Sequence, residues 1–226
     1  MQYFSQNTFD FLRELENNNN RDWFGANKKR YEEYLVKPAF GFIEGFEPYL
    51  KGISCHFDAV AKKVGGSLFR IYKDTRFSKD KTPYKTHIGI HFRHERAKDV
   101  HAPGFYLHLS PKECFVGAGI WHPASKELYM IREYLAENFR LWQKILKNKE
   151  FAGTFELTGD RLIRPPQGFA KEHPAIEHLK YKDFIAVKHI KPKEALGRNF
   201  LANTASVFEK SRYFVKFLSK ALNLRF

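Results

Sequence analysis

Cysteine is scarce in this sequence, since only Cys55 and Cys114 occur among 226 residues. Their separation matches neither the close spacing of a zinc site nor the regular spacing of a disulfide framework. No long run of apolar residues occurs, which argues against a membrane span. The first residues, MQYFSQNTFDFLREL, also lack the basic and apolar segments of a secretory signal. These absences predict a protein with reduced thiols that is located in the cytoplasm and has no membrane partner.

Several catalytic signatures are missing as well. There is no Gly-x-x-x-x-Gly-Lys-(Ser/Thr) phosphate loop, and Gly117-Ala118-Gly119 lacks the third glycine of a dinucleotide-binding loop. No Gly-x-Ser-x-Gly elbow occurs, so the usual sign of an α/β-hydrolase is absent. The histidines show neither His-x-His nor His-Glu-x-x-His spacing. We therefore expect no metal ion and no cofactor.

Positive charge is what the sequence has in excess. Lysine and arginine number 39 against 25 aspartates and glutamates, which gives a formal net charge of +14. A surface with this charge attracts polyanions over about a Debye length, roughly 10 Å at moderate salt. The expected partner is therefore an anionic small molecule or a nucleic acid, and the sequence indicates no particular oligomeric state. Hydrophobic residues at 43% and 23 phenylalanines are sufficient for a full globular core.

Strand-like alternation and helical periodicity both occur along the chain, which predicts an α+β fold. Consecutive strands joined by short loops are usually antiparallel neighbours. The expected architecture is thus a mainly antiparallel sheet flanked by helices, in a single domain over residues 1–226. Residues 1–50 should form a helical segment packed on that sheet, and the chain from Pro192 should form a helical C-terminus. The predicted strands are 68–72, 86–93, 104–110, 113–121, a hairpin of 155–157 with 161–163, and 184–189.

Particular residues are expected to start or interrupt helices. Ser5 or Thr8 should cap the first helix, and Ser125 should cap a helix that follows the strand at 113–121. Pro38 should break or kink the second helix. Pro174 should start a short helix.

The segment Leu68–His91, LFRIYKDTRFSKDKTPYKTHIGIH, concentrates charge between two strand-like runs. Its cations would repel one another unless an anion lies among them, because Asp74 and Asp80 offset only part of the charge. Arginine forks and lysine ammonium groups both bind phosphate and carboxylate. The segment therefore predicts an anion site formed by Arg70, Lys73, Arg76, Lys81 and Lys85.

A second polar group is expected on the sheet itself. In a strand, residues two apart lie on the same face. Glycines on such a face leave room above the backbone, and a histidine there can exchange a proton near neutral pH. The residues expected to share this face are His87, His91, Tyr106, His108, Gly117 and Gly119.

The spacing Arg70-x-x-Lys73-Asp74-x-Arg76-Phe77-x-x-x-Lys81-x-x-Tyr84 resembles the motif of a bacterial family, domain of unknown function 2461. In that family an arginine stands where this chain has Lys73, so bidentate donation is lost at that position. The stretches YLHLSPKECFVGAGIWHP and RPPQGFAKEHPAIEHL extend the resemblance along the chain. The resemblance implies a bacterial protein and carries no activity with it.

Three hypotheses for function stay open at this point. In the first, the basic motif at 70–87 binds a phosphate-bearing or other anionic ligand, including nucleic acid. In the second, the protein is an enzyme acting on an anionic substrate, with Asp74, Tyr84 and His87 as catalytic acid–base groups and the cations stabilising charge. In the third, the motif is purely structural, and Asp74 pairs with Arg76.

Overall fold

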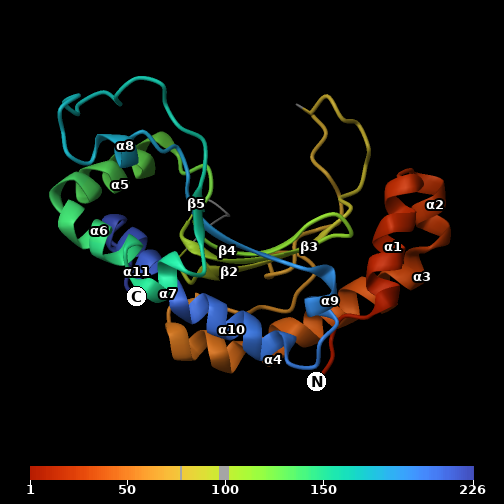
Figure 1. The fold of residues 1–226 in the computed structure, drawn as a ribbon. Helices are drawn as coiled ribbons and strands as arrows, with labels where there is room; N and C mark the ends of the chain where they lie inside the picture. Colours follow the sequence, from red (N-terminus) through yellow and green to blue (C-terminus); the bar gives the residue numbers. More distant parts are fainter. Residues whose placement is uncertain (77, 97–101) are drawn as a thin grey trace.

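The computed structural model describes residues 1–76, 78–96 and 102–226 (Figure 1). At the centre of these ranges lies a six-stranded sheet, antiparallel throughout, in the order β1-β2-β3-β4-β6-β5. This sheet, with its flanking helices, confirms the predicted α+β class. The strands are β1 (Phe57–Asp58), β2 (Ile88–His94), β3 (Gly104–Leu109), β4 (Cys114–Ile120), β5 (Glu156–Thr158) and β6 (Phe184–Ile190).

Helices precede the sheet, follow β4 and form the C-terminus, as the sequence predicted. The first begins after Ser5, whose backbone N–H donates to the Thr8 hydroxyl at 3.2 Å. A π-helical turn, η1 (Glu32–Val36), leads directly into α4. The α-helices are α1 (Gln6–Asn17), α2 (Arg21–Ala26), α3 (Lys28–Tyr31), α4 (Lys37–Ile53), α5 (Ser125–Glu137), α6 (Phe139–Leu146), α7 (Lys149–Ala152), α8 (Ile176–Leu179), α9 (Pro192–Ala195), α10 (Phe200–Lys210) and α11 (Arg212–Ala221).

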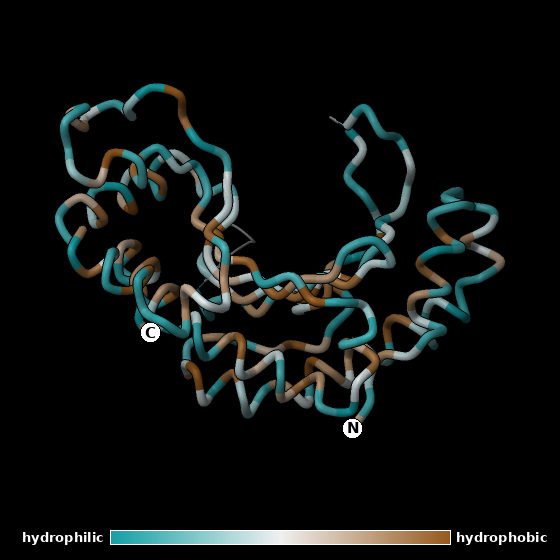
Figure 2. The backbone as a smooth tube through the Cα atoms, viewed as in Figure 1, coloured by the Kyte–Doolittle hydropathy of each residue, from teal (hydrophilic) through white to brown (hydrophobic). Residues whose placement is uncertain are grey.

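Helices α4 and α10 cover one face of the sheet (Figure 1). Phe46 of α4 stacks on Phe92 of β2 with ring centroids 4.7 Å apart, and Phe208 of α10 lies 5.0 Å from Phe105 of β3. All four rings are buried. Figure 2 shows hydrophobic residues gathered along the sheet and these two helices. Burying each such ring stabilises the fold by about 1.5–3 kcal/mol, so this layer is a major part of the core.

The opposite face of the sheet is polar and carries aromatic side chains. His91 of β2 lies opposite Tyr106 of β3, and Tyr106 lies opposite Gly117 of β4. The register therefore confirms that these three residues share a face. The His87 ring stacks on His108 with centroids 4.3 Å apart, which places this pair on the same face.

A second apolar cluster surrounds Trp142 of α6, which is fully buried. Its ring lies 5.0 Å from Phe217 and 5.4 Å from Phe214, both on α11, and 5.9 Å from Phe184 at the start of β6. The C-terminal helix is thereby fastened to the sheet and to the helices after β4. Within the described ranges, none of the helices combines the length and apolar character that a membrane span needs.

The predicted strand at 68–72 is wrong. This segment makes only single bridges within the described structure, Leu68 to Ile90 and Tyr72 to Tyr84. The Phe69 N–H still donates to the Gly89 carbonyl of β2 at 2.8 Å, but from Ile71 onward the chain pairs with the returning arm of its own loop. Figure 1 shows this loop extending away from the sheet.

The predicted hairpin across residues 158–160 is also wrong. Strand β5 pairs with β6, where Leu157 lies opposite Ala186, and Arg161 instead forms a single bridge with Tyr181. After Gly159, whose φ is +137°, the chain bonds to residues 180–182: the Lys182 N–H donates to the Asp160 carbonyl at 2.7 Å, and the Leu162 N–H donates to the Lys180 carbonyl at 2.8 Å.

Three helix boundaries differ from the prediction. Ser125 is the first residue of α5, and Ala124 is its N-cap. Pro38 lies in the first turn of α4, directly after the π-helical turn η1, and the chain stays helical through it. The helix predicted from Pro174 begins at Ile176. The motif position Phe77 and residues 97–101 lie outside the described ranges.

Candidate functional site

The basic motif folds into a narrow two-armed loop. Its arms are joined by backbone hydrogen bonds from Lys73 N–H to the Pro83 carbonyl at 2.9 Å and from Lys85 N–H to the Ile71 carbonyl at 2.7 Å. Ile71 is buried, so one side of the loop is fixed by the core while the charged side chains stay near solvent. The Lys85 ammonium also stabilises the loop, because it donates to the carbonyls of Arg70 at 2.8 Å and Tyr72 at 3.0 Å on the opposite arm.

The loop is held against the N-terminal helices by Asn19 and Phe24. The Asn19 side chain donates to the Tyr84 carbonyl at 2.9 Å and accepts the Tyr84 backbone N–H at 3.1 Å. This amide therefore satisfies the backbone of Tyr84 as a neighbouring strand would. The Tyr84 ring stacks on Phe24 of α2 with centroids 4.1 Å apart and planes 23° from parallel. Tyr84 is only 5% exposed as a result.

A cavity of about 610 Å³ lies where this loop meets the start of α2. Three cationic residues contribute to its wall: Arg21 from α2, and Lys73 and Lys81 from the two arms of the loop. None of the described lining residues is acidic. The complete lining is Asn19, Asn20, Arg21, Tyr72, Lys73, Thr75, Lys81, Pro83 and Tyr84.

Two of the predicted cations contact carboxylates of the motif itself. The Arg76 guanidinium donates to Asp74 through Nη2 at 2.8 Å and Nε at 3.0 Å, and both side chains are well exposed. These bonds lower the pKa of the Asp74 carboxyl to about 2. Lys73 forms an ion pair with Asp80, and that contact, with hydrogen bonds from Thr82, holds the Asp80 pKa well below its usual range.

The other predicted cations have backbone partners or lie at the surface. Lys81 donates to the Thr75 carbonyl at 2.9 Å. Burial lowers the pKa of Lys85, and the charge of Arg70 lowers it further. Arg70 is exposed and is not among the described residues that line the cavity. Lys73 and Lys81 are therefore the two predicted anion-binding residues at the cavity.

The three predicted acid–base residues occupy different surroundings. Tyr84 lines the cavity, and burial raises the pKa of its hydroxyl. Asp74 is engaged by Arg76. His87 lies on the sheet against His108, and burial together with the charge of that neighbour lowers its pKa to about 3. Of these three, only Tyr84 is among the described lining residues.

The N-terminal contribution to the cavity was missed by the sequence analysis. Asn19, Asn20 and Arg21 precede the motif by about fifty residues, and nothing in the spacing of the motif points to them. The available signal was an unusual density of amide side chains beside an arginine. Such a run becomes part of a site only once the fold places it against the loop.

A family model matches residues 7–217 of the chain, and its description reads Conserved hypothetical protein (DUF2461). The match covers most of the sequence and confirms the family resemblance found in the motif. No curated protein matches the chain at a significant level.

Proposed function

This chain belongs to the DUF2461 family of conserved hypothetical proteins, and from its geometry we propose that the cavity beside α2 binds a small phosphate-bearing or other anionic ligand. The observation that carries the proposal is that Arg21, Lys73 and Lys81, from separate segments, line one cavity. Like charges repel, so this arrangement favours a negative ligand among them. Asp80 offsets part of the charge at Lys73 from outside the described lining.

The size and composition of the cavity support a small ligand. A volume of about 610 Å³ lies within the range of roughly 300–1,000 Å³ that is typical of small-molecule sites. Asn19, Asn20 and Thr75 add polar groups that hydrogen-bond phosphate oxygens, and the Tyr72 ring, 60% exposed, offers a surface for an apolar or aromatic part of the ligand. The terminal phosphate of a nucleic acid presents the same chemical groups, but nucleic-acid binding differs from small-ligand binding in its steep dependence on salt.

The enzyme hypothesis has less geometric support. Its acid–base groups Asp74, Tyr84 and His87 would have to act on one substrate, but only Tyr84 is among the described residues that line the cavity. The structural hypothesis describes the contact between Asp74 and Arg76 well. Neither account explains why Arg21 and Lys81 face the same space.

Direct titration with inorganic pyrophosphate tests the proposal. Arg21→Ala and Lys81→Ala should each weaken binding at least tenfold, because one charge-assisted hydrogen bond contributes about 1.5–3 kcal/mol. Lys79→Ala is the matched control, since it removes the same charge from an exposed position in the same loop outside the described lining. Asp80→Asn should strengthen binding by removing the anion that competes for Lys73. Equal losses in Lys79→Ala and Lys81→Ala would mean that only net charge matters.

A labelled single-stranded oligonucleotide separates the two classes of ligand. Nucleic-acid binding predicts affinity that falls steeply between low and moderate salt, with a slope that grows with the number of phosphates contacted. A small-ligand site predicts that pyrophosphate competes with the oligonucleotide or binds more tightly. If neither probe binds at low salt, the proposed function is wrong.

A further inference from the structure

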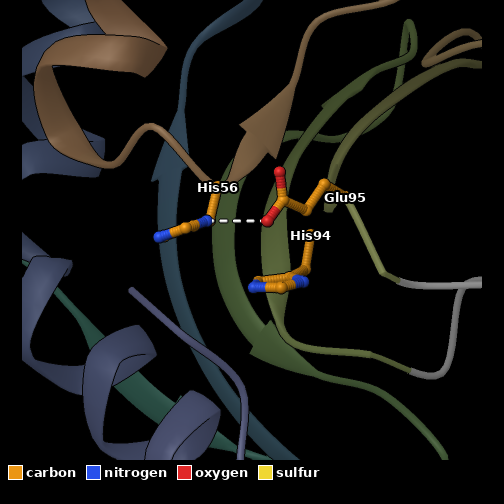
Figure 3. Close-up of side chains that lie close together, drawn as sticks. All are labelled: His56, His94 and Glu95. Atoms are coloured by element: carbon orange, nitrogen blue, oxygen red, sulfur yellow. Dashed lines mark hydrogen bonds and ion pairs between the residues drawn. The ribbon is translucent and has the colours of Figure 1, made fainter.

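Three side chains with metal-binding atoms meet at the opposite end of β2 from the basic loop (Figure 3). A ring nitrogen of His56, a ring nitrogen of His94 and a carboxylate oxygen of Glu95 all lie within 4.8 Å of one another. His56 precedes β1, and His94 ends β2, so the pairing of these two strands brings the three residues together. The His56 Nδ1 and Glu95 Oε1 atoms are 2.7 Å apart.

The surroundings of His94 select one tautomer of its ring. Its Nε2 lies 2.9 Å from the carbonyl oxygen of Arg225, which can only accept, so Nε2 carries the proton. The lone pair is then on Nδ1, which accepts the backbone N–H of Arg96 at 3.1 Å. A ring N–H held by a backbone carbonyl is also the usual outer contact of a metal-binding histidine, because it fixes the ring and raises the basicity of the other nitrogen.

We propose that His56, His94 and Glu95 bind a divalent transition-metal ion of the Zn²⁺ type. Two imidazoles and one carboxylate are a donor set that Zn²⁺ accepts, with a fourth position left for water. Zn²⁺ with bonds of about 2.0–2.2 Å needs ligand atoms roughly 3.3 Å apart in a tetrahedron. The His56 and Glu95 atoms lie 2.7 Å apart, and all three ligand atoms lie within 4.8 Å of one another, so rotations of the side chains are needed to bring them to that separation. Glu95 is 43% exposed and His56 is 20% exposed, which leaves a path for the ion and room to rotate.

Metal binding would replace two hydrogen bonds, the one between His56 and Glu95 and the one from the Arg96 N–H to His94, by three metal–ligand bonds. The His94 lone pair would leave the Arg96 N–H, which lies in an exposed residue and can bond to water instead. In return the ion would link the segment before β1 to the end of β2. Through the Arg225 carbonyl on His94, it would also steady the last residues of the chain.

A second histidine–glutamate pair in the structure provides a matched comparison. His189 Nδ1 lies 3.6 Å from Glu113 Oε1, and both side chains are exposed. Among the described residues this pair is not part of a three-ligand group. Replacing His189 therefore shows how much zinc affinity an exposed His–Glu pair contributes without a third ligand.

The test is calorimetric titration of the metal-free full chain with Zn²⁺, and with Co²⁺ read by its visible absorption. We expect one saturable site, and at least a tenfold loss of affinity in His56→Ala and Glu95→Gln but not in His189→Ala. Saturation at about a hundredfold excess over Kd should raise Tm by roughly 5–10 °C in the native chain and in His189→Ala. Thermal melts of the metal-free variants show whether each variant folds. His94 is not replaced, because it is buried and its loss could unfold the protein.

The exposed thiol of Cys55 adjoins His56 and could bind zinc itself, so a Cys55→Ser variant tests its contribution. Zinc affinity should be unchanged in Cys55→Ser. Loss of binding in Cys55→Ser, equal effects of His56→Ala and His189→Ala, or no saturable binding would each overturn the proposal.

Discussion

Asp183 holds together two turns at one end of the sheet, and replacing it should be among the most damaging single changes. The residue immediately precedes β6 and is 2% exposed. One carboxylate oxygen accepts the His122 backbone N–H at 2.6 Å, and the other accepts the Asp160 backbone N–H at 3.2 Å. His122 has a left-handed backbone with φ of +46°, and Gly159 has φ of +137°. One buried side chain therefore fixes two turns, of which the one at His122 is unfavourable for a residue with a β-carbon.

The cost of Asp183→Ala follows from these contacts. A hydrogen bond to a charged group contributes about 1.5–3 kcal/mol, so losing two predicts a decrease of roughly 3–6 kcal/mol in the free energy of unfolding. That is a large share of the roughly 5–15 kcal/mol by which a domain is usually stable. The left-handed turn at His122 loses its main support at the same time. Asp183→Asn keeps the shape but turns an N–H donor toward one backbone N–H, so it should recover at most about half of the loss.

Urea unfolding followed by far-ultraviolet circular dichroism measures this effect as a shift in midpoint at unchanged slope. Asp160→Ala is the matched control, because it removes an exposed carboxyl while its backbone N–H still donates to Asp183. We expect the control to change the free energy of unfolding by less than about 0.5 kcal/mol. A loss below about 1 kcal/mol in Asp183→Ala, or an equal loss in both variants, would refute the reasoning.

Other positions give independent predictions. In Gly119→Ala, a β-carbon would lie 2.0 Å from the Phe184 carbonyl oxygen at a φ of +129°, so thermal melts should show a loss above about 3 kcal/mol or no folded protein. Burial lowers the pKa of His91 from 6.5 to about 3. The unfolded chain therefore binds that proton first, and stability should fall as pH decreases from about 6.5 toward 3, by up to about 1.4 kcal/mol per pH unit. Urea titrations at stepped pH should show a shallower fall in His91→Phe. Asn19→Ala leaves the Tyr84 N–H and carbonyl unpaired, so unfolding should become easier by about 1–3 kcal/mol, and pyrophosphate affinity should decrease with it.

Much of the fold was predictable because local periodicity carries it. The alternation of Phe105, Leu107 and Leu109 predicted β3, and the register of the sheet confirmed which side chains share its faces. The sequence from Pro192 predicted a helical C-terminus, and its last helix packs on Trp142. The errors came where a neighbour far along the chain decided the outcome. Strand β5 pairs with β6, which lies further along the chain, and no local pattern in residues 155–163 shows this pairing.

The candidate sites divide in the same way. The sequence marked Lys73, Lys81 and Tyr84, because dense charge beside an aromatic is visible in one segment. It did not connect them with Arg21, because that contact depends on how the N-terminal helices pack on the loop. His56 and Glu95 were likewise missed as a group, since strand pairing alone brings them together.

By itself, the sequence determined the α+β class, the family, the strong positive charge and the segment in which that charge concentrates. The tertiary structure decided which charges are compensated, as at Arg76 with Asp74, and which ones share a cavity. The physical reason is the range of the interactions involved. Periodicity and composition act between residues close in the chain, whereas a binding site requires side chains from distant segments to meet within a few ångströms.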